Sequence, residues 1–189
     1  SNTLTALALC AAMTSAQMPR AKYACTHARQ VVNESKKHNF DPIVFAALIH
    51  VESNWRPHVV SSANACGLTQ VIPKWSKGYT CKQLKVPKTS IKVGSRIFGY
   101  WLNKYAKGDY LTALCGYNAG FRCKGKHPNK WGTRYAKKVM KMATLIILFC
   151  MLLRTIVIWL LPTRKSLFSL RSLIQETQKL KSGRSYTSR

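Results

Sequence analysis

Residues 143–162 form an apolar run, ATLIILFCMLLRTIVIWLLP, that limits what the rest of the chain can fold into. About 20 apolar residues in a helix span the hydrocarbon core of a bilayer, so the run has transmembrane length. Arg154 interrupts it, and Trp159 near its far end suits a membrane interface. We therefore expect one membrane-spanning helix here, against the alternative of a buried helix in a water-soluble domain.

This run divides the 189 residues into a domain before it and a tail after it. Basic residues flank both of its sides, so the positive-inside rule does not orient it. Residues 163–189 are polar and basic, and we expect them to form a flexible tail. The residues before the run suffice for one ordinary globular domain.

The first residues resemble the end of a secretory signal peptide. An apolar stretch runs from Leu4 to Met13, and small residues follow as far as Ala16, as in an h-region and its cleavage site. We expect residues 1–16 to be a truncated signal peptide, which directs the protein to the periplasm or the cell envelope. The alternative is a short hydrophobic helix of the mature protein.

Seven cysteines suit the oxidising compartment to which such a signal leads. Cys10 would leave with the signal, and Cys150 lies in the apolar run. The others are Cys25, Cys66, Cys81, Cys115 and Cys123. We expect two disulfides and one free thiol among these, with the pairing open. A zinc site formed by Cys115, Cys123 and His127 fits no common ligand spacing, so no metal site is predicted.

The charge balance is strongly basic, with 31 Lys and Arg against 5 Asp and Glu, for a net charge of +26. This favours an anionic partner, such as nucleic acid, a membrane surface or a wall polymer. The balance also restricts carboxylate chemistry. The carboxylates before the apolar run are Glu34, Asp41, Glu52 and Asp109.

The domain itself is predicted to be mainly α, with no strong strand pattern and no internal repeat. The helices expected cover residues 20–38, 42–55, 90–120 with a break near Gly108 and Asp109, and 131–142. Asp41 suits the N-cap of the second helix and Pro42 its first position. Phe40 and Phe45 suit a hydrophobic staple across that cap.

One carboxylate falls on the buried face of the second helix. Phe45, Leu48, Ile49 and Glu52 have the i, i+3, i+4, i+7 spacing of one helix face. Desolvation and the negative end of the helix dipole should both raise the pKa of Glu52. A carboxylic acid that stays protonated near neutral pH can protonate a leaving glycosidic oxygen. The alternative is a Glu that reaches the surface or pairs with Lys or Arg.

Three segments around this residue together resemble the lytic transglycosylase domain of the goose-type-lysozyme-like superfamily. The family pattern is a Glu-Ser pair on a helix, a Gly-Leu-x-Gln loop ending in Pro, and an Ala-Leu-x-x-Tyr-Asn-Ala-Gly helix end. The matching segments are ESNWRP at 52–57, SSANACGLTQVIP at 61–73 and ALCGYNAG at 113–120. The closing Thr-x-x-Tyr motif is approximated by Thr133 and Tyr135, one residue short.

The resemblance covers residues 40–141, with two departures in the loop. A common Met is Thr69 here, and a common Gly is Asn64. Thr69 is expected to line the sugar groove with less apolar surface, which bears on substrate preference and not on the reaction. The cysteine-bearing segments resemble a subset associated with phages or conjugative systems.

The resemblance implies a lysozyme-like fold for residues 17–141, followed by the hydrophobic helix over residues 143–162. It also implies an enzyme without a cofactor that cleaves the β-1,4 bond between N-acetylmuramic acid and N-acetylglucosamine in peptidoglycan. Glu52 would act as the single acid and base. It would protonate the glycosidic oxygen and then accept a proton from the sugar's 6-hydroxyl, which closes a 1,6-anhydro ring without water.

Five further residues are expected to serve this site by the same resemblance. Ser61 would orient the acetamido group of the sugar or the catalytic acid. Gln70, Tyr117 and Asn118 would line the sugar groove, and Tyr135 would contact the substrate or the acid. Three also have structural alternatives, since Ser61 suits a turn, Tyr117 the core and Asn118 a helix-end cap.

Two other functions stay open. A muramidase, that is, a hydrolytic lysozyme on the same fold, would need a second carboxylate to hold water, and Asp109 is the candidate. A non-catalytic cationic protein that binds membrane or nucleic acid would leave the pattern of Glu52, Gln70 and Tyr117 unexplained. The partners expected are peptidoglycan glycan strands, the bacterial membrane, and a secretion, conjugation or phage assembly, with no specific nucleic acid. The expected location is the periplasm or envelope, with a membrane anchor.

Overall fold

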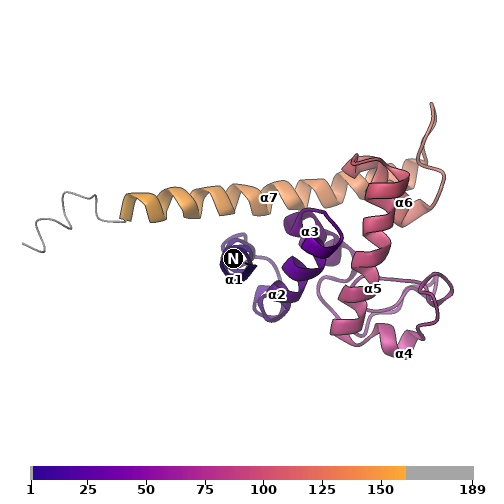
Figure 1. The fold of residues 1–189 in the computed structure, drawn as a ribbon, viewed down its shortest axis with the longest axis horizontal. Helices are drawn as coiled ribbons and strands as arrows, with labels where there is room; N and C mark the ends of the chain where they lie inside the picture. The colour runs from indigo at the N-terminus through magenta and orange to yellow at the C-terminus, as the bar shows by residue number, and fades with distance from the viewer. Residues whose placement is uncertain (1, 161–189) are drawn as a thin grey trace, which may run out of the picture. The chain divides into compact units, whose positions relative to one another are not determined.

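The computed structural model describes residues 2–160 as a succession of helices, with side-chain environments given up to Ile156 (Figure 1). The helices are α1 (Asn2–Ser15), α2 (Ala21–Lys37), α3 (Pro42–Ser53), α4 (Cys81–Leu84), α5 (Pro87–Tyr100), α6 (Tyr110–Ala119) and α7 (Lys130–Leu160). A 3-10 turn, η1 (Pro73–Trp75), and a π-helical turn, η2 (Trp101–Tyr105), complete them. Extended pairing among the described residues is limited to isolated bridges at Cys66. The prediction of a mainly α chain is confirmed.

The chain divides into two compact units, residues 1–151 and 152–189. The first unit holds all helices up to α7 and most of α7 itself. Of the second unit, only the last turns of α7 are described. The expected tail over residues 163–189 and the end of the apolar run at Pro162 lie outside the described residues.

Helix α3 begins as its sequence predicts. Asp41 Oδ1 accepts a hydrogen bond from the Ile43 amide at 2.7 Å, and Pro42 occupies the first helical position. The rings of Phe40 and Phe45 lie 5.2 Å apart, which confirms the hydrophobic staple. These local interactions fix where the helix starts and therefore which residue lies at its end.

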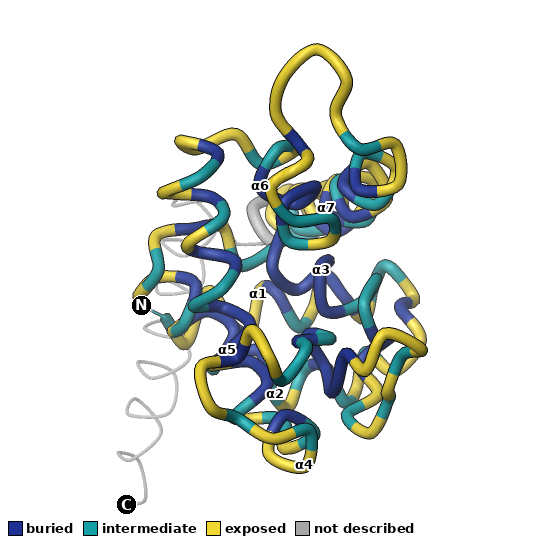
Figure 2. The backbone as a smooth tube through the Cα atoms, turned by 90° about the vertical axis from the view of Figure 1, so that its right-hand side faces the viewer, coloured by how far each residue is buried: buried dark blue, intermediate teal, exposed yellow. Residues whose placement is uncertain are grey.

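The core is built around α3, which is buried on nearly all sides (Figure 2). Residues 44–49 are at most 4% exposed. A helix that is hydrophobic all round has to lie at the centre of a domain. Phe98 of α5 packs against it, with its ring centroid 6.3 Å from that of Phe45. The end of α3 is therefore held from several directions.

The break expected near Gly108 and Asp109 separates α5 and η2 from α6. Asp109 caps α6 and accepts hydrogen bonds from the amides of Leu111 and Thr112 at 3.3 and 3.1 Å. Gly120 ends α6 at a φ of +72°, a conformation that glycine adopts without the strain of a side chain.

Residues 2–15, within the predicted signal peptide, form α1, which packs on α2. Its inner face, Leu9, Ala12 and Met13, is at most 2% exposed. A disulfide joins Cys10 to Cys25 of α2. This is the arrangement of the alternative, a hydrophobic helix of the mature protein, because cleavage after Ala16 would remove half of the disulfide. Signal cleavage itself stays a prediction.

The cysteine pairing differs from the expectation of two disulfides and one free thiol among five cysteines. There are three disulfides, Cys10–Cys25, Cys66–Cys81 and Cys115–Cys123, and Cys150 is free. Two of these disulfides, Cys66–Cys81 and Cys115–Cys123, lie among the five cysteines as expected. The expected free thiol was wrong, because Cys25 pairs with Cys10, which had been assigned to a removed segment. The bond between Cys115 and Cys123 also excludes the alternative zinc site, which needs both thiolates.

Helix α7 contains both the helix expected over residues 131–142 and the first part of the membrane span expected over residues 143–162. It runs without a break through residue 142. Ala136, Val139, Ala143 and Ile146 form its buried stripe, so packing against the domain continues into the apolar run. Residues 130–156 are long and apolar enough to cross a membrane, and no other described helix meets that test. The expected domain boundary therefore falls inside one continuous helix.

We predict that two glycines respond very differently to alanine. Gly67 has a φ of +79°, and a Cβ there would collide with the Leu84 carbonyl oxygen. Gly78 has a φ of +98° with open space around it. Gly78→Ala should cost only the left-handed backbone penalty, about 1–2 kcal/mol. Gly67→Ala should cost roughly 1–3 kcal/mol more because of overpacking.

Urea unfolding of both variants measures this difference in the free energy of unfolding. Equal losses would mean that the backbone around Gly67 can move away from Leu84. In that case the packing of this loop is less constrained than described.

Candidate active site

Glu52 lies in the last turn of α3, where the helix is stopped abruptly. The next residues include Asn54 and Trp55, with φ of +49° and +57°, values that are rare outside glycine. Trp55 is fully buried, and Arg20 Nε donates a hydrogen bond to its carbonyl at 3.2 Å. Strained backbone persists only where its surroundings hold it, so the helix end that carries Glu52 is fixed by packing.

Ser53, the second residue of the Glu-Ser pair, ties α3 to the Gly-Leu-x-Gln loop. Its hydroxyl is buried and lies 2.8 Å from the carbonyl oxygen of Leu68, with the Ile49 carbonyl at 3.1 Å. The loop is therefore joined directly to the residue next to Glu52.

Thr69 holds the same loop to α5 and does not line a groove. Its side chain is fully buried, and its hydroxyl lies 3.0 Å from both the carbonyl and the hydroxyl oxygen of Ser90. Gly94 leaves room for it, since a Cβ there would collide with the Thr69 side chain. The expectation that Thr69 lines the sugar groove is wrong, because two buried hydroxyls satisfy each other here.

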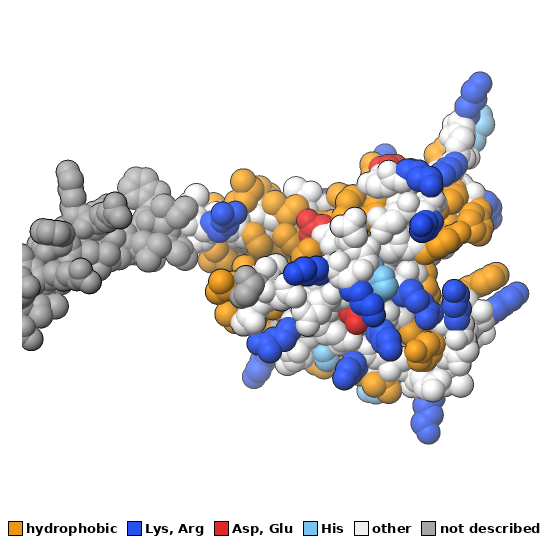
Figure 3. All heavy atoms as spheres, in the orientation of Figure 1, with side chains coloured by type: hydrophobic (Ala, Val, Ile, Leu, Met, Phe, Trp, Pro, Cys, Tyr) orange, Lys and Arg blue, Asp and Glu red, His pale blue; other side chains and the backbone are white. Residues whose placement is uncertain are grey.

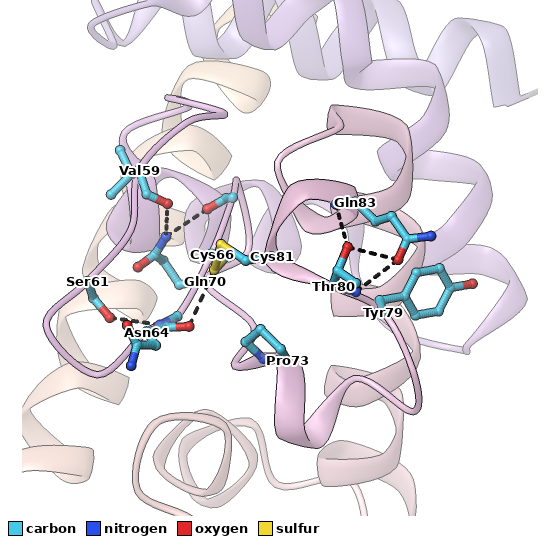
Figure 4. Close-up of a disulfide and its surroundings, with 12 residues drawn as sticks. Val59, Ser61, Asn64, Cys66, Gln70, Pro73, Tyr79, Thr80, Cys81 and Gln83 are labelled. Carbon is cyan, nitrogen blue, oxygen red and sulfur yellow. Dashed lines mark hydrogen bonds between the residues drawn. A yellow bond between two sulfur atoms is a disulfide. The ribbon is translucent and has the colours of Figure 1, made fainter.

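Gln70 closes the loop from within (Figure 4). Its Nε2 donates hydrogen bonds to the carbonyls of Val59 and Gly67 at 3.1 and 2.9 Å. The disulfide from Cys66 to Cys81 anchors the loop beside it. The amide nitrogen of Gln70 is thus occupied by the loop, and its contact with a sugar stays a prediction.

Ser61 is a turn residue of this loop, which was its structural alternative. Its Oγ accepts a hydrogen bond from the Ala65 amide at 3.1 Å (Figure 4). Between them, Asn64 has a φ of +60°. Asn tolerates this left-handed conformation better than most residues, so it can stand where the family commonly has Gly. A role for Ser61 in orienting substrate stays a prediction.

Two tyrosines from distant parts of the chain surround the carboxyl group. Tyr135 of α7 donates a hydrogen bond to Glu52 Oε1 at 2.6 Å. Tyr117 of α6 donates to the Thr69 carbonyl at 2.7 Å, with its ring edge against Phe98. Burial, and then the negative charge of Glu52, raise the pKa of both phenols well above 10. Asn118, also predicted for the groove, is exposed near the end of α6.

The carboxyl group of Glu52 titrates near neutrality. Burial raises its pKa from 4.5 to about 7, while the hydrogen bond from Tyr135 and the positive charge of Lys138 lower it. The group is therefore present in both protonation states at neutral pH. Such a group can donate and accept protons in one reaction cycle.

The other three carboxylates of the described residues have structural partners. Asp41 and Asp109 cap helices, and Glu34 accepts a hydrogen bond from Ser95 at 3.3 Å. Asp109 begins α6, about 12 Å along the helix from the position of Tyr117. Among the described residues, the charged group that shifts the pKa of Glu52 is Lys138, and no carboxylate contributes to that shift.

Sequence reasoning missed Ser53 and Lys138 as residues of the site. The sequence does indicate both residues. Ser53 is the second member of the Glu-Ser pair. Lys138 lies three residues after Tyr135, hence on the same face of a helix.

Residues 30–140 match the transglycosylase SLT domain family. Over 98 residues the chain is 33% identical to the membrane-bound lytic murein transglycosylase D of Escherichia coli strain K12, an alignment that covers 48% of this chain and 21% of that protein. The protein of the same name from Escherichia coli O6:H1 matches to the same extent. The chain thus spans about a fifth of the length of these relatives.

The fold also has a counterpart among solved structures. An inactive mutant of the lytic transglycosylase Slt from Pseudomonas aeruginosa superposes with a TM-score of 0.57 at 21% identity. The match covers 64% of this chain and 24% of that one. The expected lysozyme-like transglycosylase fold is confirmed.

The raised pKa of Glu52 predicts a specific pH dependence of stability. Between pH 4.5 and about 7 the folded protein keeps a proton that the unfolded chain releases. The free energy of unfolding should therefore fall by roughly 3 kcal/mol as the pH rises through this range. Glu52→Gln cannot ionise and should lose this contribution.

Urea unfolding of wild type and Glu52→Gln at about pH 4 and about pH 8 isolates the contribution, because all other titrating groups are shared. We expect the variant to gain stability relative to wild type at the higher pH. An unchanged difference between the two proteins would show that the folded pKa is close to 4.5.

Proposed function

Because the chain belongs to the transglycosylase SLT domain family, we propose that it is a peptidoglycan lytic transglycosylase in which Glu52 is both acid and base. The observation that carries this proposal is the state of Glu52. Burial holds its pKa at about 7, one tyrosine orients it, and the charges that act on it within the described residues include no second carboxylate.

In the first step, neutral Glu52 gives its proton to the glycosidic oxygen between N-acetylmuramic acid and N-acetylglucosamine. The bond from the anomeric carbon to that oxygen breaks, and the acetamido oxygen of the substrate stabilises the positive anomeric carbon. In the second step, Glu52 accepts the proton of the sugar's 6-hydroxyl, and the oxygen of that hydroxyl bonds to the anomeric carbon. The product ends in a 1,6-anhydro ring, and no water is consumed.

Tyr135 supports both steps through one contact. Its hydroxyl donates to Oε1, which favours the acid proton on Oε2. After proton transfer, the same hydrogen bond stabilises the carboxylate. Lys138 adds a positive charge that acts in the same direction. Tyr135 is therefore a positioning residue of the catalytic acid.

The alternatives have less support. A muramidase needs a second carboxylate to hold a water molecule, and the candidate Asp109 is occupied as a helix cap. A purely binding protein has no use for a buried carboxyl group that costs stability at neutral pH.

We propose a location in the cell envelope, with α7 as the membrane anchor. The length and composition of residues 130–156 and the membrane-bound relatives support this. Peptidoglycan strands are the proposed substrate. A secretion, conjugation or phage assembly as the user of this activity stays a prediction.

The experiment that tests the proposal is mass spectrometry of soluble fragments released from purified sacculi. We expect products one water lighter than reducing muropeptides. Glu52→Gln should lower the rate by about 10²–10⁴-fold, because one group serves as both acid and base. Reducing products would establish hydrolysis instead, and no release by the wild type would leave a binding function.

A second prediction concerns Tyr135→Phe. In the wild type, the hydrogen bond from Tyr135 lowers the pKa of Glu52. Without that bond, the Glu52 carboxyl group should keep its proton to higher pH. The alkaline limb of kcat/KM, where the acid becomes ionised, should shift upward while the maximal rate falls.

Tyr105→Phe is the matched control, since its hydroxyl donates to the Phe121 carbonyl at 3.1 Å and not to the site. We expect its pH profile to follow that of wild type. An unshifted limb in Tyr135→Phe would contradict the positioning role.

A further inference from the structure

A groove of about 870 Å³ lies between the C-terminal end of α3 and α7, and Glu52 is among its lining residues. On the α7 side it is lined by Lys138 and Lys141, followed by Met142, Leu145 and Leu148. Arg56 adds a third basic side chain, and Glu52 is the single acid in its lining. The groove is thus positive near the carboxyl group and apolar farther along.

The order of these side chains follows from the helix. Lys138, Lys141, Leu145 and Leu148 recur at i, i+3, i+7 and i+10, so they share one face of α7. At 1.5 Å per residue, the lysines lie about 4.5 and 9 Å beyond Tyr135, and the leucines about 15 and 20 Å. Tyr135 contacts Glu52, so these distances start at the catalytic carboxyl group.

The apolar end of the groove belongs to a surface suited to lipid. Leu148 is 52% exposed on α7, and Leu4 and Leu7 of α1 are 68% and 61% exposed. Helix α1 approaches α7 at Ala8, whose carbonyl oxygen lies 3.9 Å from Cys150 Sγ. Helix α1 carries no charged residue. Figure 3 shows hydrophobic side chains over this part of the molecule, while most Lys and Arg lie over the rest of the domain, beside further hydrophobic patches.

The continuity of α7 places the reaction close to that surface. The apolar run starts at Ala143, eight residues and about 12 Å beyond Tyr135. The headgroup layer on each side of a bilayer is about 5–8 Å thick. If the run enters a membrane, Glu52 therefore works just above the headgroups.

We propose that this groove binds the lipid-linked end of a glycan, that is, a saccharide joined through a diphosphate to a membrane hydrocarbon chain. The inference rests on the proposed function, which places the saccharide at Glu52. Lys138 and Arg56 would flank the saccharide next to Glu52, Lys141 would hold the diphosphate, and Leu145 and Leu148 would contact the first part of the hydrocarbon chain. The order of a carboxyl, a positive and an apolar section in the groove follows the order of saccharide, diphosphate and hydrocarbon chain in this ligand.

The reaction then releases a glycan strand from its membrane anchor. The glycosidic bond breaks, and the proton of the 6-hydroxyl passes by way of Glu52 to the leaving oxygen. The released strand carries the 1,6-anhydro end. The lipid keeps its diphosphate and a short saccharide with a free 4-hydroxyl.

The test uses the full chain in vesicles of neutral phosphatidylcholine. The substrates are a polyprenyl-diphosphate-linked glycan in the same vesicles and a glycan of equal length without the lipid. A shared membrane raises the encounter rate of the linked substrate by itself, so the wild-type ratio of kcat/KM is only the reference. The decisive quantity is how each variant changes that ratio.

Two pairs of variants separate the groove from its surroundings. Lys141→Gln removes a groove cation, while Lys137→Gln removes an exposed cation of the same helix that does not line the groove. Leu148→Ala and Ile147→Ala form the apolar pair, with Ile147 exposed outside the groove. We expect Lys141→Gln to lower the ratio about tenfold, the effect of one charge-assisted contact. Leu148→Ala should lower it several-fold, and both controls should retain it.

If both variants of a pair change the ratio of kcat/KM equally, this inference is overturned. The proposed function still stands in that case, provided that the free glycan is cleaved. Loss of the preference on adding anionic phosphatidylglycerol vesicles would also overturn it, since the groove would then take any anionic lipid. No cleavage of either substrate would overturn the proposed function and this inference together.

Discussion

The burial of one carboxyl group is the constraint on which this structure depends. Glu52 lies at the end of a helix whose other residues form the centre of the core, and burial holds its pKa at about 7. A buried acid of this kind destabilises the fold whenever it ionises. The surrounding structure has to offset that cost, and it does so with one hydrogen bond from Tyr135 and the nearby charge of Lys138.

The loop beside Glu52 is held from three helices at once. The Leu68 carbonyl accepts a hydrogen bond from Ser53 of α3. The next residue, Thr69, bonds through its amide to Ser90 of α5 and through its carbonyl to Tyr117 of α6. The disulfide to Cys81 and the side chain of Gln70 close the loop itself. A loop held in this way keeps the end of α3, and with it Glu52, in a fixed position, which is what proton transfer at a fixed distance requires.

Helix α7 links the chemistry to the membrane-suited part of the chain. The same helix supplies Tyr135, packs its buried stripe against the domain and continues into the apolar run. Because α7 has no break between Tyr135 and Ala143, helix geometry sets the distance from the active site to the first residue of that run. The groove along its face is a consequence of this arrangement.

Local sequence determined the helix starts and ends: the caps at Asp41 and Asp109, the staple of Phe40 on Phe45, and the break before α6. It also singled out Glu52, because helical spacing places a carboxylate on an apolar face. These features depend on residues a few positions apart. The resemblance to a known family also pointed to Tyr135 as a contact of the acid, and the hydrogen bond to Glu52 across 83 residues agrees with it. Tertiary structure alone decided the rest: that Tyr117 bonds to the Thr69 carbonyl, that Thr69 turns inward to Ser90, and that Cys10 pairs with Cys25. Such contacts depend on how helices pack, and no short-range pattern in the chain encodes that packing.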